Sequence, residues 1–131
     1  MQFQGTANNV EIVGWLGADP EQRFIQSGAA VTSFSVATKR PSHSDGEPKT
    51  EWIPVEAWER LAELIARHLH KGSRVRVTGM LIIRSWEDRE TGQRRSRMVV
   101  RAENVLFLDS RQLLHQDEAE ETMETLEDLP F

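Results

Sequence analysis

The chain has 131 residues, a formal net charge of −5 and no cysteine. This length predicts one domain with at most a short appendage, and the lack of cysteine excludes a disulfide framework and a thiolate metal site. No signal peptide is evident, and the longest apolar run, 80–83, is too short to cross a bilayer, so we expect a soluble cytoplasmic protein.

The charge is unevenly distributed along the chain. Residues 109–131 hold eight acids and one base, whereas residues 1–108 hold 15 bases and 13 acids. The sequence therefore predicts a mildly basic domain over 1–108. It also predicts a strongly acidic, largely disordered tail over 109–131.

Three β-strands are predicted in the first half of the chain. Residues 9–16 alternate between apolar and polar side chains, with Gly14 on the apolar parity, where a glycine suggests a bulge or a sharp bend. Residues 30–38 and 50–58 are also rich in strand formers, although Pro54 weakens the third strand. The segment "KRPSHSDGEPK" has the composition of a loop.

A helix is predicted over 59–70. Its apolar side chains recur at helical spacing, and Gly72 is expected to cap its end. Two long strands follow at 74–86 and 95–108, joined by a turn around Gly92. This order predicts an all-β fold, a five-stranded OB-fold barrel with one α-helix between the third and fourth strands. An α+β sandwich with a split sheet fits the same pattern.

Rings and positive charge share one face of the predicted strands. Side chains alternate across a strand, so Trp52, Trp58 and Trp86 fall on the parity opposite the predicted core. That core face of the fourth strand includes Leu81 and Ile83. A tryptophan in a small domain is more often a core residue, but rings beside arginines suit single-stranded nucleic acid, because bases stack on rings and guanidinium groups neutralise phosphates. The candidate phosphate contacts are Arg76, Arg84, Arg95 and Arg97.

Residues 8–108 resemble the bacterial single-stranded DNA-binding proteins, the SSB family. The resemblance rests on five segments in this order: "NNVEIVGWLGADPEQRF", "TEW", "WERLAE", "HKGSRVRVTG" and "RSWEDRETGQ". It implies an OB-fold, a homotetramer, a nucleoid-associated location and binding of single-stranded DNA without sequence preference. It also implies that Trp52, Trp58 and Trp86 are base-stacking rings.

Three features depart from the family pattern. The loop after the second strand offers His43 where many members have a stacking tryptophan. Trp15 stands where a polar or basic residue is frequent, and is either an additional stacking ring or part of a subunit contact. The tail lacks the usual Gly-, Pro- or Gln-rich linker, since residues 109–125 contain neither glycine nor proline.

The end of the tail, "LEDLPF", is similar to the family's acidic tip. The resemblance implies that the tip recruits replication, recombination and repair proteins. Leu129 and Phe131, the apolar residues that flank Pro130, would enter a pocket on the partner protein, while Asp128 would contact basic residues of that partner. The alternative is an inert solubilising tail.

Other classes of function find less support. The four histidines lack metal-ligand spacing, and neither a Gly-rich phosphate loop nor a nucleophile elbow is present, so we expect no enzymatic activity, no metal and no cofactor. A primosome-type OB protein, a binder of single-stranded RNA and a pure protein-interaction module remain as alternatives.

Overall fold

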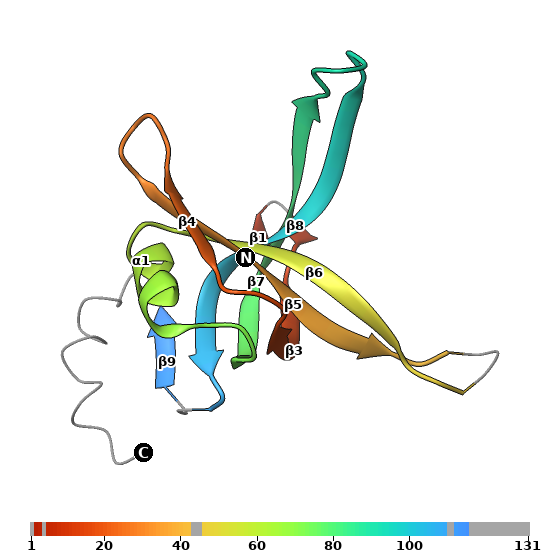
Figure 1. Ribbon diagram of the computed structural model, residues 1–131, viewed down its shortest axis with the longest axis vertical. Helices are drawn as coiled ribbons and strands as arrows, with labels where there is room; N and C mark the ends of the chain where they lie inside the picture. The colour runs from red at the N-terminus through yellow and green to blue at the C-terminus, as the bar shows by residue number, and fades with distance from the viewer. Residues whose placement is uncertain (1, 4, 43–45, 110–111, 116–131) are drawn as a thin grey trace.

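The computed structural model describes residues 2–3, 5–42, 46–109 and 112–115, and these residues are mostly strand. The elements in chain order are β1 (Gln2–Phe3), β2 (Thr6–Ala7), β3 (Val10–Leu16), β4 (Glu21–Phe24), β5 (Ala30–Arg40), β6 (Lys49–Trp58), α1 (Glu59–His68), β7 (Arg74–Glu87), β8 (Arg94–Phe107) and β9 (Gln112–His115). β1 pairs with β2, and the other strands form one sheet of order β3-β7-β8-β6-β5-β4, with β9 beside β8 (Figure 1).

The pairings of five strands form a closed circuit. β3 pairs with β7 along most of its length and with β5 at its end, while β6 joins β5 to β8. The pairing of β6 with β8 is parallel and includes Val55, the residue after Pro54.

Two glycines allow the strands to cross closely. A Cβ added at Gly14 would lie 2.0 Å from the carbonyl oxygen of Ala37, and one at Gly79 would lie 2.0 Å from that of Arg101. A side chain at either position would therefore push two main chains apart. The register of β7 and β8 shifts where Thr78 pairs with Asn104 and Gly79 pairs with Ala102, so the extra residue is Glu103 and the bulge lies in β8.

The predicted strands correspond to β3, β5, β6, β7 and β8, and the predicted helix lies between the third and fourth of them, as expected. β4 was not predicted, because its four residues are all exposed and show no alternation. β1 and β2 are too short to give a pattern. β9 and Asp109 lie within the segment predicted as tail, 109–131. Residues 110–111 and 116–131 of that segment lie outside the described residues, as do residues 43–45 of the loop.

Helix α1 packs against β5 and β6, with neighbouring contacts to β4 and β9 (Figure 1). Its buried side chains are Leu61, Ala62, Leu64 and Ile65. The hydroxyl of Thr32 on β5 donates a hydrogen bond of 2.7 Å to the carbonyl of Ala62, which ties the helix to the sheet.

The end of α1 differs from the prediction. The helix ends at His68, and Leu69 is its C-cap, with an N–H that donates to Ile65. Gly72 lies further along in a turn with φ of +90°, and its N–H donates to the carbonyl of Leu16 at 2.9 Å. Gly72 therefore connects the turn to β3 and does not cap the helix.

Three hairpins extend from the body of the sheet: β4–β5, β5–β6 and β7–β8 (Figure 1). In the third, residues 81–87 pair with 94–100, and we call this pair of segments the arm. The prediction of a core face along β7 is correct for Val75 and Val77 but wrong for Leu81 and Ile83, which are exposed. Beyond Gly79 the strand leaves the core, and the alternation continues where no second layer of described residues buries Leu81 and Ile83.

Candidate nucleic-acid interface

One face of β6, β7 and β8 carries six of the eight predicted DNA-binding residues. Residues directly opposite one another in a sheet share a face, and the register pairs Glu56 with Arg101, Arg84 with Arg97, and Trp86 with Arg95. We call this the outer face. Its rings and charged groups are Trp52, Glu56, Trp58, Arg84, Trp86, Arg95, Arg97 and Arg101.

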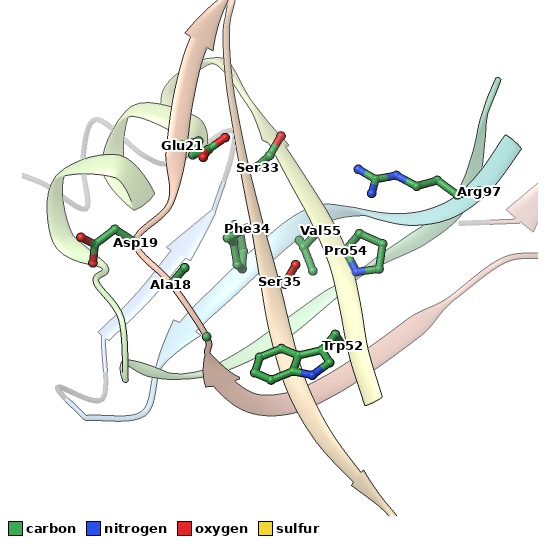
Figure 2. A pocket seen from close by; sticks show the side chains of 11 residues that line it. Ala18, Asp19, Glu21, Ser33, Phe34, Ser35, Trp52, Pro54, Val55 and Arg97 are labelled. Carbon is green, nitrogen blue, oxygen red and sulfur yellow. The ribbon is translucent and has the colours of Figure 1, made fainter. Parts of the chain in front are cut away.

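Trp52 and Arg97 line a groove of about 390 Å³ over β5 and β6. Figure 2 shows the Arg97 side chain extending from β8 toward β6, with Trp52 at one end of the groove. Trp52 is 58% exposed, and its ring lies directly over the backbone of Gly17. Within the described part of the chain, Arg97 has no ion-pair partner. A flat ring and a free cation therefore border one open groove.

Trp58 is held in a cluster of charged groups. Its indole Nε1–H donates to Glu56 Oε1 at 3.0 Å, and the guanidinium carbons of Arg101 and Arg84 lie 5.0 Å and 5.9 Å from its ring centroid. Both distances fit cation–π contact. Arg84 donates to Glu56 as well, from Nε to Oε2 at 3.2 Å and from Nη2 to Oε1. The half-buried Trp58 is therefore fixed at its edge, and cations lie near its ring.

Glu56 is a carboxylate buried on the outer face, with 6% of its surface exposed. Burial raises the pKa of Glu56, but hydrogen bonds from Arg84 and Trp58 and the charges of Arg84 and Arg101 outweigh this effect, so the pKa lies below its ordinary value. The hydrogen bond to Glu56 raises the pKa of Arg84. The carboxylate is therefore ionised at neutral pH, and the cluster carries one net positive charge.

Trp86 and Arg95 are cross-strand neighbours on the arm. Trp86 is 44% exposed. Arg95 Nε donates to Asp88 Oδ2 at 2.9 Å, and the other oxygen of Asp88 accepts the N–H of Glu90 at 2.9 Å. These two hydrogen bonds, that of Glu90 first, lower the pKa of Asp88. The turn thus fixes a carboxylate that holds Arg95.

Trp15 and Arg76 lie on the side of the sheet formed by β3 and the start of β7. Trp15 is opposite both Arg74 and Ala37, and Ala37 is opposite Trp52. The two tryptophans are thus two strands apart in one row, roughly 10 Å from each other by strand spacing. The Arg74 guanidinium lies 5.6 Å from the ring centroid of Trp15, which is 45% exposed. Arg76 Nη2 donates to Glu11 Oε2 at 2.8 Å.

The sequence places Arg74 on the non-core parity of the fourth strand, but Arg74 and Arg101 were not among the predicted phosphate contacts, and no role was predicted for Glu56. Alternation could have added both arginines to the predicted phosphate contacts, because Arg74 shares the parity of Arg76, and Arg101 shares that of Arg95 and Arg97. No local pattern reveals a hydrogen bond between strands β6 and β7. The predicted tip residues, Asp128, Leu129, Pro130 and Phe131, lie outside the described residues, as does His43.

The described residues contain no cluster of three or more acidic or histidine side chains that could hold a metal ion. Helix α1, the one helix among them, is not long and apolar enough to cross a membrane. The groups that the outer face presents are rings, guanidinium groups and one buried carboxylate. Rings can stack on bases, and guanidinium groups can neutralise phosphates.

Known proteins are similar in sequence to this chain over most of its length. The model of the single-strand binding protein family matches residues 7–108. The chain is 36% identical to single-stranded DNA-binding protein 1 of Synechocystis sp. over 118 residues, which is 90% of this chain and 93% of that protein. It is 36% identical to single-stranded DNA-binding protein 1 of Nostoc sp., covering 80% of this chain and 86% of that protein. It is 40% identical to the single-stranded DNA-binding protein of Halalkalibacterium halodurans, covering 79% of this chain and 62% of that protein. The chain therefore belongs to the single-strand binding protein family.

Proposed function

We propose that this chain binds single-stranded DNA without sequence specificity through the outer face. The observation that carries the proposal is the row of exposed rings and guanidinium groups along β6, β7 and β8 of a chain from this family. Bases would stack on Trp52, Trp58 and Trp86, while Arg84, Arg95 and Arg97 neutralise phosphates. Trp15 and Arg76 would extend the path around β3, because Trp15 lies in one row with Trp52.

The proposal includes an OB-fold barrel over 1–108. The closed circuit of β3, β7, β8, β6 and β5, with α1 between β6 and β7, supports it. An OB-fold binds oligonucleotides on its open strand face. The acidic segment 109–131 would be a separate interaction tail.

A homotetramer is part of the proposal. Ile83 and Met98 face each other across the arm on the side opposite the outer face, and they are 67% and 62% exposed. An exposed apolar pair on neighbouring strands supports burial by another subunit. Light scattering of the full chain at micromolar concentration should give the mass of four chains, and Ile83→Lys should lower it. A monomer in both cases would contradict this part.

The wider role follows from the same proposal. The protein would protect single-stranded DNA in the cytoplasm during replication, recombination and repair. Its tip, Asp128 to Phe131, would recruit partner proteins, as the terminal "LEDLPF" suggests. No catalytic step or cofactor is required for this role.

Titration with oligo(dT), oligo(U) and duplex DNA tests the proposal. Oligo(dT) should quench the tryptophan fluorescence and bind more tightly as salt is lowered, whereas duplex DNA should bind weakly. Stacking alone does not distinguish RNA from DNA, because it does not read the 2′-hydroxyl. Tighter binding of oligo(U) than of oligo(dT) would therefore favour RNA as the ligand. Failure to bind any of the three would leave a protein-interaction module.

A further inference from the structure

Glu56 presents a contradiction on a face proposed to bind a polyanion. It is an ionised carboxylate, its surface is 6% exposed, and it lies between Trp58 and Arg84. A buried charge persists only where hydrogen bonds compensate for its lost hydration. Trp58 Nε1–H and two nitrogens of Arg84 provide that compensation. The question is whether Glu56 competes with DNA phosphates or prepares the face for them.

The geometry of Arg84 decides between these roles. Arg84 uses Nε and Nη2 on Glu56, and within the described residues its Nη1 has no partner. The guanidinium is a planar fork with five N–H donors, and the side chain is 45% exposed. Arg84 can therefore donate from Nη1 to a phosphate without releasing Glu56. Release would leave a buried carboxylate without its partner, which is strongly unfavourable.

The same carboxylate orients the Trp58 ring. The hydrogen bond to Nε1–H fixes the edge of the indole, and Arg101 lies 5.0 Å from the ring centroid on the neighbouring strand. A ring and a cation that are ordered before binding lose less conformational entropy when a base and a phosphate arrive. Glu56 thus fixes one stacking group and one phosphate donor at once.

We infer that Glu56 is a positioning residue that holds Trp58 and Arg84 in the geometry for base stacking and phosphate contact. The inference rests on the proposed function. It predicts a sign opposite to that of simple electrostatics: removing this negative charge from the outer face weakens binding of single-stranded DNA.

Two variants of Glu56 and one control test the inference in the full-length chain. Glu56→Gln removes the charge and keeps an acceptor oxygen, whereas Glu56→Asp keeps the charge and shortens the reach. The matched control is Glu11→Gln, because Glu11 also pairs with an arginine, Arg76 at 2.8 Å, but is exposed. Thermal unfolding shows that each variant is folded, and the second Glu56 variant serves if the first is not.

Dissociation constants for oligo(dT) are measured at several salt concentrations. Both Glu56 variants should bind about three- to tenfold more weakly, which is less than the loss of a whole charged hydrogen bond because Trp58 and Arg84 are loosened and not removed. The slope of log K against log salt should also flatten by up to about 0.7 as a phosphate contact is lost. Glu11→Gln should bind as tightly as the wild type or more tightly. A spectroscopic readout accompanies this: the indole N–H resonance of Trp58, assigned with Trp58→Phe, should shift in both Glu56 variants.

The outcomes separate the inference from the proposed function. If the wild type binds oligo(dT) but Glu56→Gln binds more tightly with a steeper salt slope, Glu56 is a competitor and the inference is overturned. Wild-type affinity and an unshifted Trp58 resonance in Glu56→Asp would overturn it as well. If the wild type does not bind single-stranded DNA, the proposed function fails first, and the inference fails with it.

Discussion

Alanine at position 17 should move the Trp52 ring without removing it. A Cβ built on Gly17 would lie 2.2 Å from Cζ3 of Trp52 and 2.7 Å from Cη2. Ordinary contact begins at 3.4 Å, so the ring must move by about 1.2 Å. The ring is 58% exposed, and its shift meets little resistance. Gly17→Ala therefore changes the position of a proposed stacking platform and leaves every charge in place.

The expected effect on binding is a fraction of one stacking contact. Base stacking on a ring contributes about 1–3 kcal/mol, so a displaced ring should cost about 0.5–1.5 kcal/mol, or roughly two- to tenfold in affinity. The fold should tolerate the change. Replacing glycine with alanine in a compatible backbone stabilises the fold by about 0.4–1 kcal/mol. This gain offsets the stability lost when the Trp52 ring moves away from residue 17.

Fluorescence anisotropy of a labelled oligo(dT) measures this without relying on tryptophan emission. The control is a double-mutant cycle with Trp52→Ala, because coupled residues show non-additive effects. Gly17→Ala should weaken binding in the wild type and have no effect in the Trp52→Ala background. Equal weakening in both backgrounds would show that the alanine acts through the backbone, and the reasoning about Trp52 would be refuted.

Four further predictions concern other parts of the chain. Trp86→Ala should weaken oligo(dT) binding by about 1–3 kcal/mol with an unchanged melting temperature; unfolding without loss of affinity would make the ring structural. Because the pKa of Glu56 is lowered in the folded protein, its ionised form stabilises the fold at pH values above 4.5, its ordinary pKa. This stabilisation is lost as the pH falls through the lowered pKa. In urea unfolding, Glu56→Gln should therefore lose less free energy of unfolding on acidification than the wild type. In the tail, deleting 117–131 should tighten DNA binding at 0.01 M salt and change little above 0.1 M. Deleting Phe131 alone should abolish partner capture in a pull-down and leave DNA affinity unchanged.

Alternation and composition predicted the strands that face a core. β3, β5, β6, β7 and β8 each bury one parity over part of their length, and that burial leaves a period of two in the sequence. β4 has no buried side chain, so its sequence carries no such period. Leu81 and Ile83 misled the prediction because the same alternation continues into the arm, where the second layer is absent from the described residues.

The candidate site was predictable as a set of residues on one parity, but its internal contacts were not. The sequence places Trp52, Glu56 and Trp58 on one side of β6. It does not show that Glu56 receives hydrogen bonds from Trp58 and from Arg84, which lies 28 residues further along the chain. Such contacts depend on the register between strands, and register is set by the whole sheet.

The contacts of the four predicted phosphate-binding arginines imply that they contribute unequally. Arg97 borders the Trp52 groove and has no ion-pair partner among the described residues, so each phosphate it neutralises releases counterions. Arg76 already pairs with Glu11 in an exposed bridge, which is worth about 0–1 kcal/mol and is easily exchanged. A phosphate that displaces Glu11 from Arg76 leaves the Glu11 carboxylate to bind a cation from solution. This uptake cancels part of the counterion release from the DNA. Arg97→Ala should therefore flatten the salt slope by about 0.7 and Arg76→Ala by less, while Glu11→Gln should steepen it. If Arg76→Ala flattens the salt slope and Arg97→Ala does not, the bound DNA runs along β3 and not through the Trp52 groove.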